Sequence, residues 1–205
     1  MEEKKVNSRN WVRLFLSTLL VGAVTTVIVA FIVRWDQHTA QFANGEYLQF
    51  LSIIAWYIGV GLIFSIISQM GFFAYLTIHR FGLGIFKSLW SAVQLVLIVF
   101  VLFDLVYFRY ISFANEGDSL LPYFGFPIFL LVYGLLVAYV KKAQTNKHAF
   151  IPALFFMVVV TTIEWFPALR ENEPGWLLFM LFPLLACNSY QLLLLHRLNK
   201  TSATK

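Results

Sequence analysis

The hydrophobic and polar positions of this chain alternate in long blocks rather than residue by residue. Six apolar stretches are separated by short polar segments, and each approaches or exceeds the roughly 20 residues with which an α-helix crosses a bilayer. The pattern therefore predicts an all-α polytopic membrane protein, a bundle of six transmembrane helices. The predicted spans are residues 11–33, 50–76, 88–108, 121–140, 149–166 and 176–195.

Two of these stretches raise separate questions. The first is too long for a signal peptide and no small-residue cleavage site follows it, so we expect it to be retained as a span. The second is uncharged from Tyr47 to Ile78. At about 1.5 Å per residue, that run is far longer than a bilayer is thick. We expect this helix to tilt, to break near Gly71, or to extend into the cytoplasm.

The polar segments between the spans are short. None of them is long enough to bury a hydrophobic core of its own. Residues 1–205 are therefore predicted to form a single integral membrane domain, which excludes an attached kinase, nucleotide-binding or peptidase domain.

The cations occur mainly in alternate polar segments. Both terminal segments and the second and fourth loops hold most of the 15 Lys and Arg residues, whereas the intervening segments hold one each. Basic short segments stay on the cytoplasmic side of a membrane. Both termini are therefore predicted to be cytoplasmic, in the plasma membrane. The cations of the intervening segments are Arg34, Arg109 and Arg170.

The composition supports a membrane location and limits the other function classes. Hydrophobic residues make up 60% of the chain and charged residues 12%, about half the charge of a soluble domain. The net charge of +5 is concentrated at the predicted cytoplasmic ends of spans, so we expect contact with membrane lipids and no nucleic acid partner. One cysteine and four histidines, without metal-ligand spacing, predict no metal and no cofactor.

Two acids lie inside predicted spans, Asp104 in the third and Glu164 in the fifth. An ionisable group in hydrocarbon costs at least a few kcal/mol unless it is paired or reaches water. One interpretation is an outward-facing polar pocket for a cation, a proton or a small ligand, with Arg34, Arg109 and Arg170 as partners. The more common alternative is that each acid reaches the interface or forms a structural ion pair.

Two features favour contact with a partner. Ala55, Gly59 and Gly61, together with Ser65, form a small-residue face on the second span. Such a face suits close helix packing inside the bundle or with another protein. The second loop is predicted to be a tight cytoplasmic turn whose glycines permit unusual backbone angles. It would present cationic and aromatic side chains to lipid headgroups or to a partner. Its candidate contact residues are His79, Arg80, Phe81, Gly82 and Gly84.

The tryptophans lie mainly at the ends of the predicted spans. Tryptophan is enriched at membrane–water interfaces, which is where span ends lie. We expect them to be interface anchors. They are Trp11, Trp35, Trp90, Trp165 and Trp176.

The motifs of common membrane and soluble enzymes are absent from the chain. There is no His-Glu-x-x-His zinc motif and no Gly-x-Ser-x-Gly nucleophile motif. The sequence therefore predicts no catalytic residues and a protein that is not an enzyme. A lipid-modifying enzyme is the least favoured alternative, because no nucleophile or metal site is apparent.

Three features together resemble a known family. They are the opening segment 8–15, the segment 71–86 with its His-Arg-Phe-Gly-Leu-Gly core, and the six-span layout. These resemble the KinB-signalling pathway activation proteins, small multi-pass membrane proteins of sporulating bacilli, over residues 8–199. The resemblance implies a role upstream of a membrane-bound sensor histidine kinase that feeds the sporulation phosphorelay.

The sequence is consistent with two functions. The first is a non-enzymatic membrane regulator that promotes activation of a KinB-type kinase by binding two of its states differently. The second is a small transporter or ligand receptor that uses the Asp/Glu/Arg pocket. Neutralising Asp104 and Glu164 separates them, because it abolishes transport or ligand response only in the second case.

Overall fold

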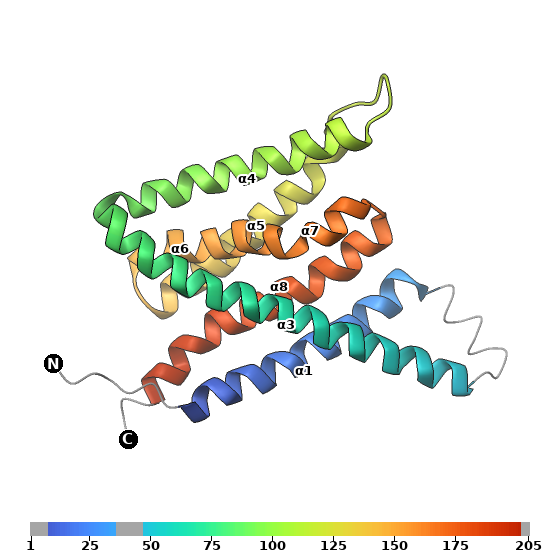
Figure 1. Ribbon diagram of the computed structural model, residues 1–205, viewed down its shortest axis with the longest axis horizontal. Helices are drawn as coiled ribbons and strands as arrows, with labels where there is room; N and C mark the ends of the chain where they lie inside the picture. Colours follow the sequence, from blue (N-terminus) through green and yellow to red (C-terminus); the bar gives the residue numbers. More distant parts are fainter. Residues whose placement is uncertain (1–7, 36–46, 202–205) are drawn as a thin grey trace. The chain divides into compact units, whose positions relative to one another are not determined.

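The computed structural model describes residues 8–35 and 47–201, with side chains as far as residue 195 (Figure 1). This part of the chain is helical and contains no strand, which confirms the all-α prediction. The α-helices are α1 (Ser8–Val33), α3 (Tyr47–Phe86), α4 (Trp90–Phe113), α5 (Gly125–Gln144), α6 (Phe150–Phe155), α7 (Thr161–Glu171) and α8 (Pro174–Thr201). Short 3-10 turns, η1 (Lys87–Leu89), η2 (Leu121–Phe124) and η3 (Lys147–Ala149), precede α4, α5 and α6, and the π-helical segment η4 (Phe156–Val160) joins α6 to α7.

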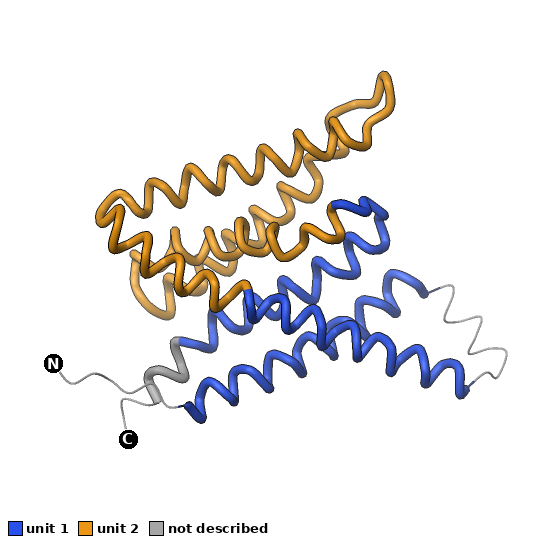
Figure 2. Tube along the Cα trace, viewed as in Figure 1, with its two compact units in different colours: residues 1–70, 170–205 blue, residues 71–169 orange. Residues whose placement is uncertain are grey.

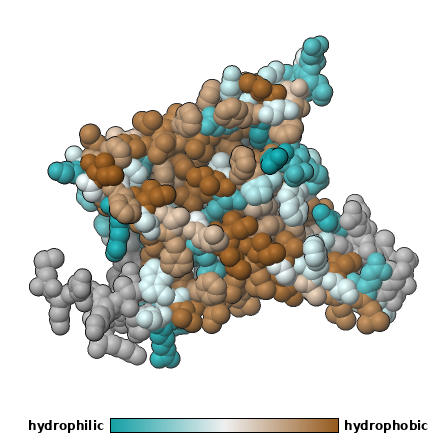
Figure 3. Space-filling view, in the orientation of Figure 1, coloured by the Kyte–Doolittle hydropathy of each residue, from teal (hydrophilic) through white to brown (hydrophobic). Residues whose placement is uncertain are grey.

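Each of the six predicted spans lies in helical structure. Among the described residues, five helical segments are long and apolar enough to cross a membrane, judged by length and composition. One of them, Tyr47–Phe113, contains both α3 and α4. Large apolar side chains are exposed on the outer faces of these helices (Figure 3).

The chain divides into two compact units, residues 1–70 with 170–205 and residues 71–169 (Figure 2). Unit 1 contains α1, the first part of α3, and α8. Here Gly22 of α1 and Gly61 of α3 face each other so closely that a Cβ on Gly61 would lie 2.7 Å from the Gly22 carbonyl oxygen. Small residues allow two helix backbones to approach in this way.

Buried polar side chains also connect α3 with α8 inside unit 1. The Ser68 hydroxyl donates to Asn188 Oδ1 at 2.6 Å, and Gln191 Nε2 donates to Ser68 Oγ at 2.7 Å. All three residues are buried. Hydrocarbon offers no hydrogen-bond partners to polar side chains. Hydrogen bonds between two helices therefore stabilise their pairing in an apolar medium.

Unit 2 contains the last part of α3 together with α4, α5, α6, η4 and most of α7. Its most buried stretch is residues 153–161, in which every residue is buried. This stretch includes η4, where the π-helical pattern inserts a local bulge. Such bulges shift the faces that the flanking helical turns present.

Helix α3 is continuous over 40 residues, which corresponds to about 60 Å. It has no break at Gly71, so that alternative for the second stretch is wrong. The chain reverses direction at Lys87, which has φ 51. Gly82 and Gly84 lie inside α3 and do not have positive φ. The prediction that these glycines supply unusual backbone angles is therefore wrong, because Lys87 adopts the left-handed conformation instead.

Candidate functional site

The turn between α3 and α4 is built around the side chain of Trp90, which is buried. Its indole Nε1–H donates to His79 Nδ1 at 3.0 Å. The Phe86 ring stacks on it with a centroid distance of 5.7 Å and an interplanar angle of 14°. Gly82 provides the space for the indole, because a Cβ at that position would overlap its ring atoms. We call His79, Gly82, Phe86 and Trp90 the turn cluster.

The hydrogen bond to Trp90 defines the protonation of His79. Because Nδ1 accepts a hydrogen bond from the indole N–H, Nδ1 carries no proton, and the proton of the neutral ring is on Nε2. Burial lowers the pKa of His79 below its ordinary value. His79 is therefore a neutral structural partner of Trp90 near pH 7 and not a cation of the loop.

Tyr75, one turn before His79 on α3, connects the turn cluster to α6. Its hydroxyl donates to the Pro152 carbonyl oxygen at 3.2 Å. Its ring lies 5.7 Å from the His79 ring and 4.9 Å from the Phe156 ring, measured between centroids. The inner face of this end of α3 is thus held by hydrogen bonds and aromatic contacts at consecutive turns.

The opposite face of the same helical turns is exposed. Phe81 is 67% exposed and Ile85 is 71% exposed, and Arg80 and Gly84 are exposed beside them. The pairs 80/84 and 81/85 are each four residues apart, so they lie along one side of the helix. No heavy atom lies within 4 Å of a Cβ built on Gly84. We call Arg80, Phe81, Gly84 and Ile85 the exposed face of the turn.

The turn cluster and the exposed face divide the predicted contact residues of the second loop. His79 and Gly82 belong to the inner packing, whereas Arg80, Phe81 and Gly84 are available to a partner.

Two of the tryptophans that we expected at span ends, Trp90 and Trp165, are buried. The prediction that they anchor the chain at a membrane interface is therefore wrong, because their rings pack inside the protein.

The small-residue face of the second span divides in the same way. Gly61 is buried against α1 inside unit 1, with Ala23 and the Thr26 hydroxyl next to it. Gly59 is exposed, and a Cβ there would meet no heavy atom within 4 Å. Of the two glycines, Gly59 is the one that a second protein could approach.

The residues of the predicted polar pocket are in different surroundings. In unit 1, the Arg34 guanidinium lies over the Phe179 ring at 5.8 Å, and Arg170 is exposed. The other three residues belong to unit 2. Of these, Asp104 and Arg109 are half-buried on α4, and Glu164 is buried on α7.

In unit 2, two of these residues have specific neighbours. The Arg109 guanidinium lies over the rings of Phe126 and Tyr123, at 5.1 and 5.7 Å from their centroids. Glu164 packs against Gly71. No group of three His, Cys, Asp or Glu side chains within the described ranges could hold a metal ion.

The sequence interpretation did not find the central residue of the site, Trp90, or its support by Tyr75 and Phe86. A detectable signal was the concentration of aromatic residues on both sides of Gly82. A glycine among large aromatic side chains frequently marks a close approach between chain segments. Which aromatic side chain fills that space depends on the tertiary register of α3 and α4.

Over the residues that the structure describes, fold and site define a small helical protein in which two long apolar helices, α3 and α4, are joined at a tightly packed aromatic turn. A family model described as KinB-signalling pathway activation in sporulation matches residues 22–198. The KinB-signaling pathway activation protein of Bacillus subtilis (strain 168) is 51% identical over 192 residues, which cover 93% of this chain and 97% of the relative. The chain therefore belongs to the family of KinB-signalling pathway activation proteins, as the resemblance predicts. No solved structure matches it.

Proposed function

We propose that this protein is a non-enzymatic regulator in the cell membrane that promotes activation of a KinB-type sensor histidine kinase. The kinase would then feed the sporulation phosphorelay. The proposal is supported by the family description and by the name of the Bacillus subtilis relative, which covers nearly the whole chain.

The membrane arrangement is part of this proposal. It consists of six spans with both termini in the cytoplasm. The apolar helical segments support the spans, and the cations in alternate segments support the orientation. Exposed apolar side chains on α1, α4 and α5 support the contact with lipid. In this orientation the turn between α3 and α4 faces the cytoplasm.

The proposed mechanism is binding rather than catalysis, in agreement with a sequence that lacks the catalytic motifs named above. Such a chain influences a kinase only by binding one conformation of it more tightly than another, because a partner that binds both equally shifts no equilibrium. A tenfold shift requires a difference in binding free energy of about 1.4 kcal/mol. A few apolar contacts and one charge-assisted hydrogen bond supply that difference.

The proposed contact surface rests on the last turns of α3, which have one packed face and one exposed face. Its inner face is fixed by Trp90 and Tyr75, and its exposed face carries Arg80 and Phe81. A surface held in one geometry loses little conformational entropy when it binds. We therefore propose the exposed face of the turn as the main kinase contact, with Gly59 as a second contact inside the membrane.

Site-specific photocrosslinking in living cells that contain the kinase tests this contact. A photoreactive residue at Phe81 is expected to capture the kinase, and one at Gly59 is expected to do so more weakly. Leu136, which is 62% exposed on α5, is the matched control and is expected to capture lipid. Capture of only lipid or further copies of this chain at both test positions would refute the proposed contact.

A further inference from the structure

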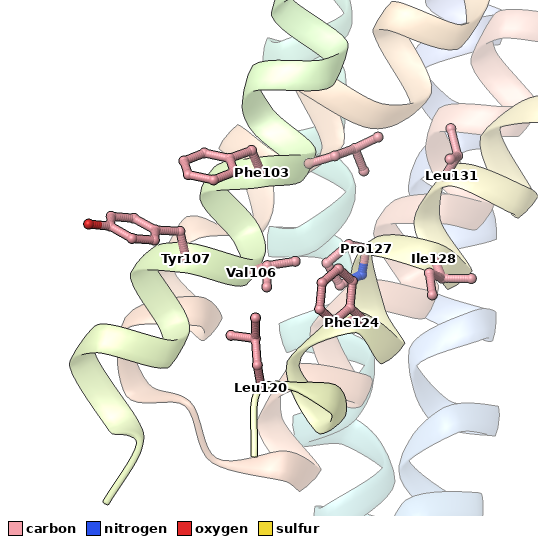
Figure 4. A pocket seen from close by; sticks show the side chains of 9 residues that line it. Phe103, Val106, Tyr107, Leu120, Phe124, Pro127, Ile128 and Leu131 are labelled. Carbon is pink, nitrogen blue, oxygen red and sulfur yellow. The ribbon is translucent and has the colours of Figure 1, made fainter. Parts of the chain in front are cut away.

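Unit 2 contains an apolar cavity between α4 and the start of α5. Its volume is about 310 Å³. Leu102 and Val106 line it from α4, and Phe124, Pro127 and Leu131 line it from η2 and α5 (Figure 4). The Tyr107 hydroxyl, the one polar side-chain group among the lining residues, points away from the cavity. The cavity therefore suits a hydrocarbon ligand.

The rim of the cavity is open to the surroundings of the helices. Phe103 is 57% exposed and Ile128 is 55% exposed, and both line the cavity. In a bilayer, exposed apolar side chains of this kind face lipid. The cavity is therefore open to the bilayer from the side in the proposed membrane location. An acyl chain of a surrounding lipid has direct access to it.

A cation lies beyond one end of the apolar lining. Arg109 follows Val106 by three residues and Leu102 by seven, so the three share one face of α4. The Arg109 guanidinium is held over the rings of Phe126 and Tyr123, which are neighbours in sequence of the lining residues Pro127 and Phe124. An apolar cavity with a fixed guanidinium beyond its end matches a ligand with an apolar tail and an anionic head.

We propose that this cavity binds one acyl chain of an anionic phospholipid whose phosphate group pairs with Arg109. The acyl chain leaves one hydrocarbon environment for another, so its transfer contributes little and the headgroup determines selectivity. The inference rests on the proposed membrane location of the chain. The site lies in unit 2 alone and does not involve the turn cluster.

The test uses the purified full chain in phosphatidylcholine vesicles that contain a trace of a phospholipid with a photoreactive group in the upper half of one acyl chain, because the lining of α4 begins within about 10 Å of Arg109. The phosphatidylglycerol probe is expected to label peptides that line the cavity about fivefold more than the phosphatidylcholine probe, the preference that one cation gives near anionic lipid. Arg109→Gln is expected to remove this preference while the labelled positions stay the same.

Neighbouring positions on α5 provide a matched pair of variants. Leu131→Trp fills the cavity and is expected to reduce labelling of its lining, whereas Val132→Trp, at a position that does not line the cavity and is 51% exposed, is expected to leave it unchanged. If Leu131→Trp does not fold, Leu120→Trp replaces it, because Leu120 lines the cavity and is 42% exposed.

Three results would overturn the inference. They are equal labelling by both phospholipid probes, label spread evenly along α5, and labelling of the cavity by a photoreactive free fatty acid alone. Carbonate extraction of cell membranes separates this failure from that of the proposed function. A chain that does not remain in the washed membrane contradicts the membrane location, whereas an inserted chain without selective labelling contradicts only the lipid site.

Discussion

Gly71 of α3 lies directly against the carboxylate of Glu164 on α7, so that a Cβ at position 71 would overlap Glu164 Oε1. Glu164 is 6% exposed, and a buried carboxylate needs close, favourable surroundings in an apolar medium. The glycine therefore provides the room that the acid occupies in unit 2. The acid packs against the backbone of α3.

Gly71→Ala is expected to destabilise the protein by about 1–3 kcal/mol, because the added methyl group overpacks this contact. Gly59→Ala is the control, since a Cβ there meets no neighbour. Thermal unfolding of the detergent-solubilised protein measures both. Adding Glu164→Ala to Gly71→Ala should recover part of the loss, and strict additivity of the two changes would contradict the contact.

The stability of the protein is expected to fall as the pH drops below about 6.5. Because burial lowers the pKa of His79 in the folded state, the unfolded chain binds more protons in that range and unfolding is favoured. His79→Gln is expected to flatten this part of the pH profile of the unfolding temperature. A profile that His79→Gln leaves unchanged would contradict the prediction.

Gly82→Ala is expected to displace the indole of Trp90 and to lower kinase activation, whereas Gly84→Ala has room for its methyl group. Helix propensity alone favours alanine by about 1 kcal/mol at both positions. We therefore expect Gly82→Ala to lower the stability of the protein and Gly84→Ala to raise it. Thermal unfolding compares the two variants, and a sporulation reporter follows Gly82→Ala. Equal changes in stability would show that Gly82 does not serve the turn cluster.

Glu173 caps the first turn of α8. Its carboxylate accepts hydrogen bonds from the backbone N–H groups of Gly175 and Trp176, and Pro174 occupies the first helical position. Glu173→Ala is expected to cost about 1 kcal/mol. Glu171→Ala, at the last residue of α7, is the control for loss of charge, and an equal effect of both changes would contradict the capping role.

The helices of this protein could be predicted from hydropathy, because apolar stretches of this length have few alternatives in a membrane. The reversal of the chain at Lys87 could not be predicted, because no local sequence pattern marks a lysine with positive φ. The prediction placed the unusual backbone angles at Gly82 and Gly84 instead. The π-helical segment 156–160 was also missed. Its sequence does not differ from that of an ordinary apolar α-helix.

Parts of the site were predicted for reasons that differ from those in the structure. The second loop was selected for its glycines and cations, and Gly82 proved to matter through the space that it leaves for Trp90. The contact between Gly71 and Glu164 depends on how α3 and α7 align. A single sequence does not encode that register in any local pattern, because both helices are apolar on several faces.

Autophosphorylation of the kinase in proteoliposomes, with and without this protein, is the most direct test of the proposed regulation. We expect the wild-type chain to raise the rate of autophosphorylation, and Arg80→Gln with Phe81→Ala to remove the increase without loss of folding. Leu136→Ala, at an exposed position of α5, should behave as the wild type. An unchanged rate at every ratio of the two proteins would contradict the proposal that this chain activates the kinase directly.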